Sequence, residues 1–400
     1  MAHRDARGGC LGCVTVVFLA VAITVVAILR FAPPFASNVL RAYGRRAQDA
    51  AERIKDRIEG TEHALDVDTS SLGFAGTFLT ESQKRAYAQL YQGLLSLEET
   101  FAVFETTADD MDPAYKALMR DHPEIFWADG SLAYTYSALG KVVTVTPGYT
   151  MSASEVAPMR MRIEAEADGL LASLGTDATE YDIARAAYTY IISTTDYDIA
   201  APDSQNIVSV FVNHVSVCAG YARAYQYLLQ RAGIFCAYVE GTVADGAEDH
   251  AWNLVNIDGE FAYVDTCWGD PTYLGSSPNI DPAGVIYDYL CLTTEEITRD
   301  GHVFEDSSIW PVCASTSLDY YRRHGLFFDA YEEAALAASF LAQTADGART
   351  CAFKFATDEA VAQTRAAIEA GTFLNSELSP RTSSYSYTVS DTLRIIKLYW

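Results

Sequence analysis

The middle of this chain takes its fold from three short stretches: Val-Ser-Val-Cys-Ala-Gly-Tyr-Ala at 215–222, His-Ala-Trp-Asn at 250–253 and Tyr-Val-Asp-Thr-Cys-Trp-Gly-Asp-Pro at 263–271. They carry a cysteine, a histidine and an aspartate in that order. A thiol nucleophile needs a general base, and the base needs a third group that orients it. We interpret three residues as candidates for these roles: Cys218, His250 and Asp265.

The cysteine stands at the beginning of a predicted helix. Gly233 marks the left-handed end of this helix, and Asn213 or Ser216 is expected to cap its start. The unpaired N–H groups and the dipole of a first helical turn favour thiolate over thiol, so Cys218 stands where a cysteine becomes nucleophilic. The buried face is predicted from the three-and-four spacing of Tyr221, Ala224, Tyr225, Leu228 and Ala232.

The histidine and the aspartate belong to a predicted β-hairpin. The segments 250–257 and 260–267 are rich in strand formers, and Asp258-Gly259 between them is a strong two-residue turn signal. Counting outward from the turn puts His250 and Asp265 on one face as diagonal neighbours, about 7–8 Å apart between Cα atoms. We expect the helix to dock its thiol over that same face, which would complete the triad.

Each of these residues also has a purely structural interpretation. A single cysteine at a helix start is usually a small buried hydrophobe, and a single histidine before an apolar strand is usually a core residue. The order and spacing of all three residues favour catalysis over this alternative. A metal site is disfavoured, because His214 precedes Cys218 but no Cys-x-x-Cys or His-x-x-x-His pair follows in this region.

Three aromatic residues are candidates for substrate contacts. Tyr197 belongs to the loop at 194–198 that leads toward the predicted helix. Trp252 and Trp268 follow the histidine and the aspartate closely in sequence, and they either line the acyl site or belong to the core. The backbone N–H of Cys218 is the natural first donor to an oxyanion, and the sequence does not identify a second donor.

At these residues the chain resembles the transglutaminase-like superfamily. That family carries a Gly-Val-Cys-x-Gly-Tyr-Ala helix start, a histidine before Ala-Trp-Asn, and an aspartate in a Val-Asp-x-Thr-Trp strand. Here Ser216 replaces the glycine of the first motif, and residues 265–268 (Asp-Thr-Cys-Trp) are a compressed form of the third. The resemblance extends upstream to 188–198 and to 121–127, and it covers roughly residues 110–330.

The resemblance implies an α+β fold, in which a papain-like core packs a catalytic helix on an antiparallel sheet. It implies that Cys218 attacks an amide carbonyl, that His250 transfers the proton, and that Asp265 orients the imidazole. It points to the bacterial membrane-anchored or secreted type, with a protein or peptide as substrate. Neither a cofactor nor a metal is expected.

The composition of the chain excludes some other functions. Among 400 residues, 53 Asp and Glu stand against 28 Lys and Arg, which gives a formal net charge of -25. Such a surface repels nucleic acid, so we expect no nucleic-acid partner. The sequence contains no phosphate loop, no dinucleotide fingerprint and no basic stripe.

The amino terminus forms a separate predicted element. Residues 10–29 are uncharged and about as long as a helix must be to span ~30 Å of hydrocarbon. We predict a membrane anchor at 10–30, between a tail at 1–9 and a helical stalk at 31–70. A cleaved signal peptide is the disfavoured alternative, because the cleavage site is poor.

The orientation of this single-pass protein has two opposing indications. Arginines are more numerous after the apolar run than before it, which favours a cytoplasmic catalytic domain. Large domains nevertheless cross membranes largely regardless of charge, and the family resemblance favours the cell exterior. We therefore expect an extracytoplasmic catalytic domain.

The rest of the chain divides into three expected units. They are a helical and β subdomain at 71–165, the catalytic core at 166–325 and a small α+β cap at 326–400. Cys291 and Cys313 could form a disulfide in an oxidising compartment. We find no internal repeats and no low-complexity tract.

These features predict a membrane-anchored thiol enzyme that acts on amide bonds. An acyl-enzyme that reacts with water belongs to a cysteine peptidase or amidase, and one that reacts with an amine belongs to a crosslinking transglutaminase. We favour hydrolysis, because nothing in the sequence marks a second acceptor site. A catalytically inactive protein-binding module with the same fold is the remaining alternative.

Overall fold

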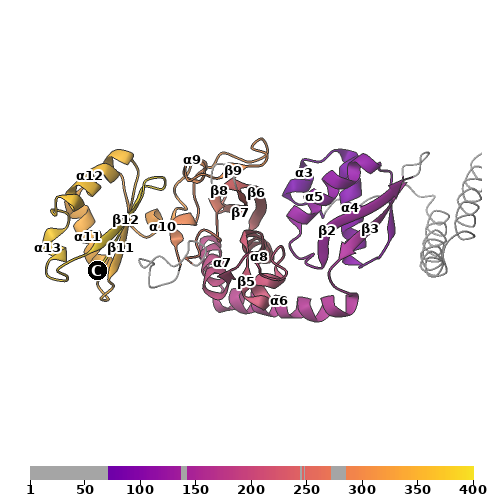
Figure 1. The fold of residues 1–400 in the computed structure, drawn as a ribbon, viewed down its shortest axis with the longest axis horizontal. Helices are drawn as coiled ribbons and strands as arrows, with labels where there is room; N and C mark the ends of the chain where they lie inside the picture. Colours follow the sequence, from indigo (N-terminus) through magenta and orange to yellow (C-terminus); the bar gives the residue numbers. More distant parts are fainter. Residues whose placement is uncertain (1–70, 137–141, 244–245, 247, 272–284) are drawn as a thin grey trace, which may run out of the picture.

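The computed structural model describes residues 71–136, 142–243, 246, 248–271 and 285–400. The predicted tail at 1–9, the anchor at 10–30 and the stalk at 31–70 lie outside the described residues. Within the described residues, no helix is both long enough and apolar enough to cross a membrane. Figure 1 shows three units side by side, with the unit that carries helix α8 (Cys218–Arg231) between the other two.

The first unit packs helices against a three-stranded antiparallel sheet of order β1-β3-β2. Trp127 lies fully buried in its core, and the indole donates a hydrogen bond to the carbonyl of Leu94. The elements are α3 (Phe74–Thr77), α4 (Glu81–Leu95), β1 (Phe101–Phe104), α5 (Met111–Asp121), β2 (Ala128–Tyr136) and β3 (Val142–Tyr149).

The middle unit has a helical half and a sheet half. Its helical half contains a short pair of parallel strands, in which Tyr197 of β4 lies beside Ser216 of β5. The long helix α6 runs along one side of this unit toward the first (Figure 1). The elements are α6 (Ala153–Ser173), α7 (Glu180–Thr194), β4 (Asp196–Tyr197), the π-helix η2 (Ser209–Asn213), β5 (Val215–Ser216) and α8 (Cys218–Arg231).

The sheet half is a four-stranded antiparallel sheet of order β8-β7-β6-β9. Ile257 pairs with Glu260 across the turn, which is the register that Asp258-Gly259 predicts. The two turn residues have φ angles of +53° and +85°, as a two-residue hairpin turn requires. The elements are β6 (Phe235–Val243), β7 (Glu248–Ile257), β8 (Glu260–Val264), η4 (Tyr287–Tyr289), α9 (Thr294–Arg299), β9 (Val303–Phe304) and α10 (Tyr320–Arg323).

Helix α8 begins at Cys218, as predicted, but its start is capped differently. Val217 is the N-cap residue and makes no side-chain capping bond. Ser216 instead shares a 2.6 Å hydrogen bond with Ser209, so the expected cap by Asn213 or Ser216 is wrong. A Cβ on Gly220 would lie 2.0 Å from the Ser216 hydroxyl, so this position requires glycine. The close approach holds the first turn of α8 against the preceding π-helix.

The first unit is fastened to the helix that carries the cysteine. Arg223, Gln226 and Gln230 of α8 donate hydrogen bonds to the successive carbonyl groups of residues 119–121 at the end of α5. These are carbonyls that a helix end leaves without partners in its own backbone. The spacing of the three donors along α8 places them on one helical face. Helix α8 therefore carries Cys218 in the middle unit and also binds the first unit through this face.

The last unit has its own sheet, of order β10-β11-β13-β12, and its own hydrophobic core. Phe353 of the central strand and Phe340 of the covering helix are both fully buried. The elements are β10 (Phe327–Phe328), α11 (Glu333–Gln343), β11 (Thr350–Phe355), α12 (Asp358–Glu369), α13 (Asn375–Leu378), β12 (Ser386–Ser390) and β13 (Ile395–Tyr399).

Candidate active site

Cys218 differs from the other described cysteines in its exposure. Its side chain is partly exposed at the first residue of α8, and it is unpaired with another cysteine. The other five are buried and also free, so Cys291 and Cys313 are not joined in the disulfide that the sequence left open. Burial raises the pKa of each of these five thiols: Cys236, Cys267, Cys291, Cys313 and Cys351.

This difference predicts selective alkylation. Iodoacetamide at mildly acidic pH is expected to modify Cys218 before any of the five buried cysteines, because those thiols are both inaccessible and protonated. Mass spectrometry of tryptic peptides after timed quenching measures each rate. Similar rates at Cys218 and at the buried cysteines would contradict a reactive thiol at the start of α8.

His250 and Asp265 form a buried hydrogen-bonded pair. Nε2 of His250 lies 2.7 Å from Oδ2 of Asp265, and their side chains are 2% and 0% exposed. The other carboxylate oxygen accepts the backbone N–H of Trp268 at 2.9 Å. The hairpin register therefore brings these two predicted residues together, and the carboxylate is held from both sides.

The electrostatics of this pair depend on Cys218 as well. Burial by itself would lower the pKa of His250, but the Asp265 carboxylate, its hydrogen bond and the hydrogen bond with Cys218 raise that pKa to about 10. Burial alone would raise the pKa of Asp265, but the charge and hydrogen bonds of His250 hold it well below its usual range. The imidazole can therefore hold a proton beside the thiol while the carboxylate stays ionised.

Helix α8 does not dock on the face that the sequence predicts. Asn253 of β7 donates to the carbonyl of Ala222 at 2.9 Å, and Ala251 clusters with Ala222, so α8 covers the face of β7 that carries these two residues. His250 and Trp252 point to the opposite face, because side chains alternate along a strand. Cys218 is nevertheless hydrogen-bonded to His250. This contact therefore lies near the start of β7, between side chains that belong to opposite faces of the sheet.

His302 is a site residue that sequence reasoning missed. Its Nε2 lies 3.0 Å from Oδ2 of Asp265, the same oxygen that His250 contacts, and its side chain is 0% exposed. His302 follows Gly301 and precedes the two-residue strand β9, which pairs with β6. No local motif surrounds it, so only the pairing of β9 brings it to the site.

The three predicted substrate-contact residues lie at different depths. Trp252 is fully buried, with its ring centroid 6.0 Å from that of His250, which favours the core interpretation. Trp268 is partly exposed, and its ring centroid lies 5.6 Å from that of His250. Tyr197 is partly exposed in β4, which pairs with the strand immediately before Val217 and Cys218.

Tyr238 of β6 is a second residue of the site that sequence reasoning missed. It is buried in a small cluster against which Cys218 packs, and the Arg223 guanidinium lies 4.3 Å from its ring centroid. Burial raises the pKa of the Tyr238 phenol, so its hydroxyl keeps its proton at neutral pH. The cluster against which Cys218 packs therefore contains a neutral hydroxyl donor.

One cluster of the described residues has the composition of a metal site. The donor atoms of His250, Asp265 and His302 lie within 4.8 Å of one another. Their spacings of 2.7 and 3.0 Å, however, are those of two N–H groups donating to one carboxylate oxygen. We therefore interpret the cluster as a hydrogen-bond network rather than as a set of ligands.

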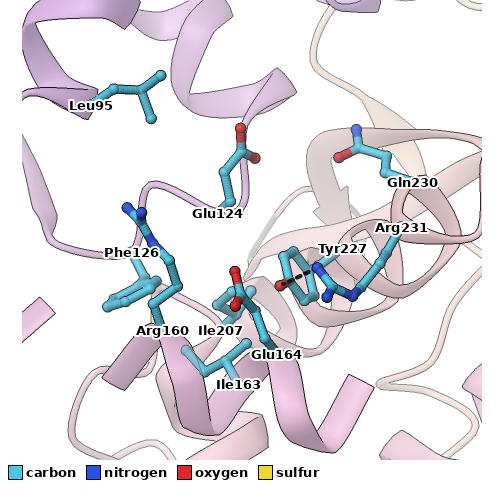
Figure 2. Close-up of a pocket in the computed structure, with 10 residues that line it drawn as sticks. All are labelled: Leu95, Glu124, Phe126, Arg160, Ile163, Glu164, Ile207, Tyr227, Gln230 and Arg231. Carbon is cyan, nitrogen blue, oxygen red and sulfur yellow. Dashed lines mark hydrogen bonds between the residues drawn. The ribbon is translucent and has the colours of Figure 1, made fainter. Parts of the chain in front are cut away.

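A cavity of about 380 Å³ lies elsewhere, between the first unit, α6 and the end of α8 (Figure 2). In its lining, the Arg231 guanidinium donates a hydrogen bond to the Tyr227 hydroxyl at 3.5 Å. None of the predicted site residues lines this cavity. Its α8 residues are roughly 13–20 Å along the helix from Cys218. The lining is Leu95, Glu124, Phe126, Arg160, Ile163, Glu164, Ile207, Tyr227, Gln230 and Arg231.

Comparison with known proteins gives matches to part of the chain. The pattern of the transglutaminase-like superfamily matches residues 169–266. Human Kyphoscoliosis peptidase is 29% identical over 118 residues, which cover 26% of this chain and 18% of that protein. The mouse Kyphoscoliosis peptidase is 27% identical over 100 residues, which cover 21% of this chain and 15% of that protein. The chain thus spans less than a fifth of these relatives.

Solved structures also resemble part of this chain. A crystal structure of a TGase is 13% identical with a TM-score of 0.27, covering 38% of this chain and 47% of that one. The periplasmic domain of TgpA from Pseudomonas aeruginosa, bound to ethylmercury, is 19% identical with a TM-score of 0.22. That match covers 32% of this chain and 55% of the other.

Proposed function

We propose that this protein is a thiol enzyme that cleaves amide bonds in proteins or peptides, because residues 169–266 match the pattern of the transglutaminase-like superfamily. Cys218 is the nucleophile, His250 the base and acid, and Asp265 the group that orients His250. One observation carries the proposal. The imidazole of His250 is hydrogen-bonded both to Cys218 and, at 2.7 Å, to the buried carboxylate of Asp265.

The proposed reaction begins with transfer of the thiol proton to His250. Asp265 engages Nε2, so Nδ1 is the atom that takes this proton. The thiolate attacks the carbonyl carbon, and the oxyanion accepts hydrogen bonds from the Cys218 backbone N–H and from the Tyr238 hydroxyl. The C–N bond then breaks, His250 protonates the departing amine, and a thioester remains on Cys218.

The second half of the proposed reaction regenerates the thiol. A water molecule gives a proton to His250 and attacks the thioester carbonyl. The C–S bond breaks, the product leaves as a carboxylic acid, and the sulfur recovers its proton from His250. Attack by an amine in place of water would instead form a new amide, which is the transglutaminase alternative.

Hydrolysis is our first choice between these outcomes. A transferase must shield its thioester from water and admit an amine, and no described residue marks a separate amine site. The inactive binding module is the weaker alternative, because Cys218 is partly exposed while its partners are buried. A module without catalysis has no need of an accessible thiol beside an ionised pair.

The proposed location of the enzyme rests on sequence alone. The anchor predicted at 10–30 would hold the chain in a membrane as a single span, with the stalk at 31–70 between the membrane and the catalytic unit. We propose that the catalytic unit lies outside the cytoplasm. A protein or peptide on the extracytoplasmic side of the membrane would then be the substrate.

A product assay tests the proposed chemistry. The full chain in detergent is incubated with glutamine-containing peptides and a fluorescent primary amine, and mass spectrometry counts cleaved, deamidated and amine-conjugated products. We expect cleavage or deamidation to exceed conjugation, and Cys218→Ala to abolish all three. Cys351→Ala is the matched control, because that cysteine is buried in the last unit.

Two results would contradict this proposal in different ways. Predominant amine conjugation that disappears in Cys218→Ala would make the protein a transglutaminase. Absence of all products, from a chain whose Cys218 alkylates normally, would favour the binding module.

A further inference from the structure

We propose that His302 is a positioning residue, which holds the Asp265 carboxylate with a second imidazole and thereby keeps His250 ready for proton transfer. This inference rests on the proposed function, because it assigns His302 to the same site. Oδ2 of Asp265 is contacted by Nε2 of His250 at 2.7 Å and by Nε2 of His302 at 3.0 Å.

The carboxylate needs both imidazoles because it is fully buried. An ionised carboxylate in the interior is costly unless hydrogen bonds replace its water. Asp265 receives three donors: the two imidazoles at Oδ2 and the Trp268 backbone N–H at Oδ1. Removing His302 leaves Oδ2 with one donor instead of two.

The hydrogen bonds also determine which nitrogen of His302 carries the proton. An ionised carboxylate only accepts, so Nε2 of His302 must be the donor. Nδ1 of His302 is buried and has no hydrogen-bond partner among the described residues. A proton on that nitrogen would be a buried, unsatisfied donor, so the surroundings favour the tautomer with the proton on Nε2.

The backbone around His302 is built to bring the ring to this point. The His302 N–H donates to the carbonyl of Ile297, and the following strand β9 pairs with Gly241 and Thr242 of β6. Gly241 also pairs with His250 on the other side. A Cβ on Gly241 would lie 2.0 Å from the carbonyl oxygen of Val303, so glycine lets β9 approach closely.

Aromatic rings enclose the second imidazole. The ring centroids of Trp268 and Trp252 lie 4.5 and 5.0 Å from that of His302, and the His250 ring lies 5.5 Å away. These contacts leave His302 little freedom to rotate, and they exclude water from the shared oxygen. The donor is therefore pre-organised.

Other titratable groups among the described residues also act on Asp265. Tyr188 of α7, Tyr289 of η4 and the adjacent Cys267 interact with it electrostatically. Burial raises the pKa of each of these three groups, so they stay neutral at the pH values of interest. The two imidazoles are thus the side chains that compensate the charge of Asp265.

Cys218 alkylation provides a test that needs no substrate. The rate of iodoacetamide modification is measured by mass spectrometry from pH 4 to 9 in the full chain. Without the second donor, Asp265 takes up a proton more readily, and the His250 imidazolium loses its partner. We expect His302→Phe to move the acid limb of the profile up by about one pH unit, which is about tenfold slower alkylation on that limb.

Control variants separate positioning from folding. His302→Gln can still donate an N–H to Asp265, so its profile should stay near that of the unsubstituted protein. His302→Met is a second apolar variant with a more adaptable shape. His324→Phe replaces an exposed histidine at the C-cap of α10 and should leave the profile unchanged.

The outcomes decide the proposal. A shifted limb in either folded apolar variant, together with an unshifted limb in His302→Gln, supports it. Equal profiles in the apolar and glutamine variants overturn it, as does a purely uniform loss of rate at every pH. If both apolar variants fail to fold, the glutamine variant decides, and a displaced acid limb there contradicts the proposal. If no amide is cleaved, the proposed function is contradicted. The alkylation profile still decides whether His302 positions Asp265, because it needs no substrate.

Discussion

Replacing Asp265 with asparagine is expected to lower turnover by about 10²–10⁴-fold while the chain still folds. Asparagine fills nearly the same volume but carries no charge. His250 would then lose the carboxylate that raises its pKa to about 10. The imidazolium that forms when the thiol gives up its proton would be left without its counter-charge.

The hydrogen bonds around Asp265 explain why asparagine cannot replace it. Both carboxylate oxygens accept: Oδ2 from His250 and His302, and Oδ1 from the Trp268 N–H. An amide offers one acceptor and one NH₂ group, so in either orientation the NH₂ group meets a donor. Facing Trp268 it opposes one N–H, and facing the imidazoles it opposes two. The first orientation costs less, so the fold should survive while the charge is lost.

Steady-state kinetics on a cleaved peptide, with circular dichroism to check folding, measures the effect. Asp270→Asn is the matched control, because Asp270 is also buried and accepts a 2.5 Å hydrogen bond from Tyr221. Its expected loss of turnover is much smaller. Equal losses in the two variants would mean that Asp265 acts only through packing.

The same variant should change how stability depends on pH. The pKa of His250 is raised to about 10 in the folded state, above an unfolded value of about 6.5. Its stabilisation is therefore complete below pH ~6.5 and is lost as the pH rises toward 10. The pKa of Asp265 is lowered, so its contribution is present above pH ~4 and is lost in more acidic solution. Asp265→Asn should flatten both dependences.

Replacing Lys354 with methionine is expected to destabilise the last unit by about 3–5 kcal/mol. Nζ of Lys354 lies 2.5 Å from Asp319 and 2.6 Å from Glu296, and its side chain is 1% exposed. Lys354 belongs to β11 of the last unit, whereas Glu296 belongs to α9 of the middle unit. Methionine would leave two buried carboxylates without a cation.

Hydrogen exchange at the β11 and β13 amides measures this loss locally, because exchange reports the opening of individual segments. The matched control is Lys397→Met, since Lys397 of the neighbouring strand is also paired, at 2.8 Å with Asp288, but is 18% exposed. Its expected effect is smaller. A triple variant, Lys354→Met with Asp319→Asn and Glu296→Gln, removes all three charges and should regain much of the lost protection. Equal protection in the single and triple variants would contradict the charge argument.

Acid should partly rescue Lys354→Met. Without the cation, burial raises the folded-state pKa of both carboxylates above their unfolded values. A raised pKa stabilises the fold at low pH and ceases to do so as the pH rises. The difference between the variant and the unsubstituted protein should therefore shrink as the pH falls toward 4.

Local signals in the sequence are sufficient to predict the local parts of the candidate site. The start of α8 at Cys218 and its end before Gly233 follow from helix periodicity and backbone preference. The hairpin register follows from a two-residue turn and the period of two along each strand. Each of these signals acts between residues close together in the chain. Counting residues outward from the turn is therefore enough to predict that His250 lies near Asp265.

Contacts of these elements with residues far away in the sequence are set by tertiary packing. His302 reaches Asp265 through a two-residue strand, and the packing of α8 on β6 brings Tyr238 into the cluster against which Cys218 packs. The face on which α8 docks, and the burial of Trp252, were decided in the same way. Such contacts depend on which apolar surfaces bury one another, and a short strand with no neighbouring motif carries no local sign of its partner.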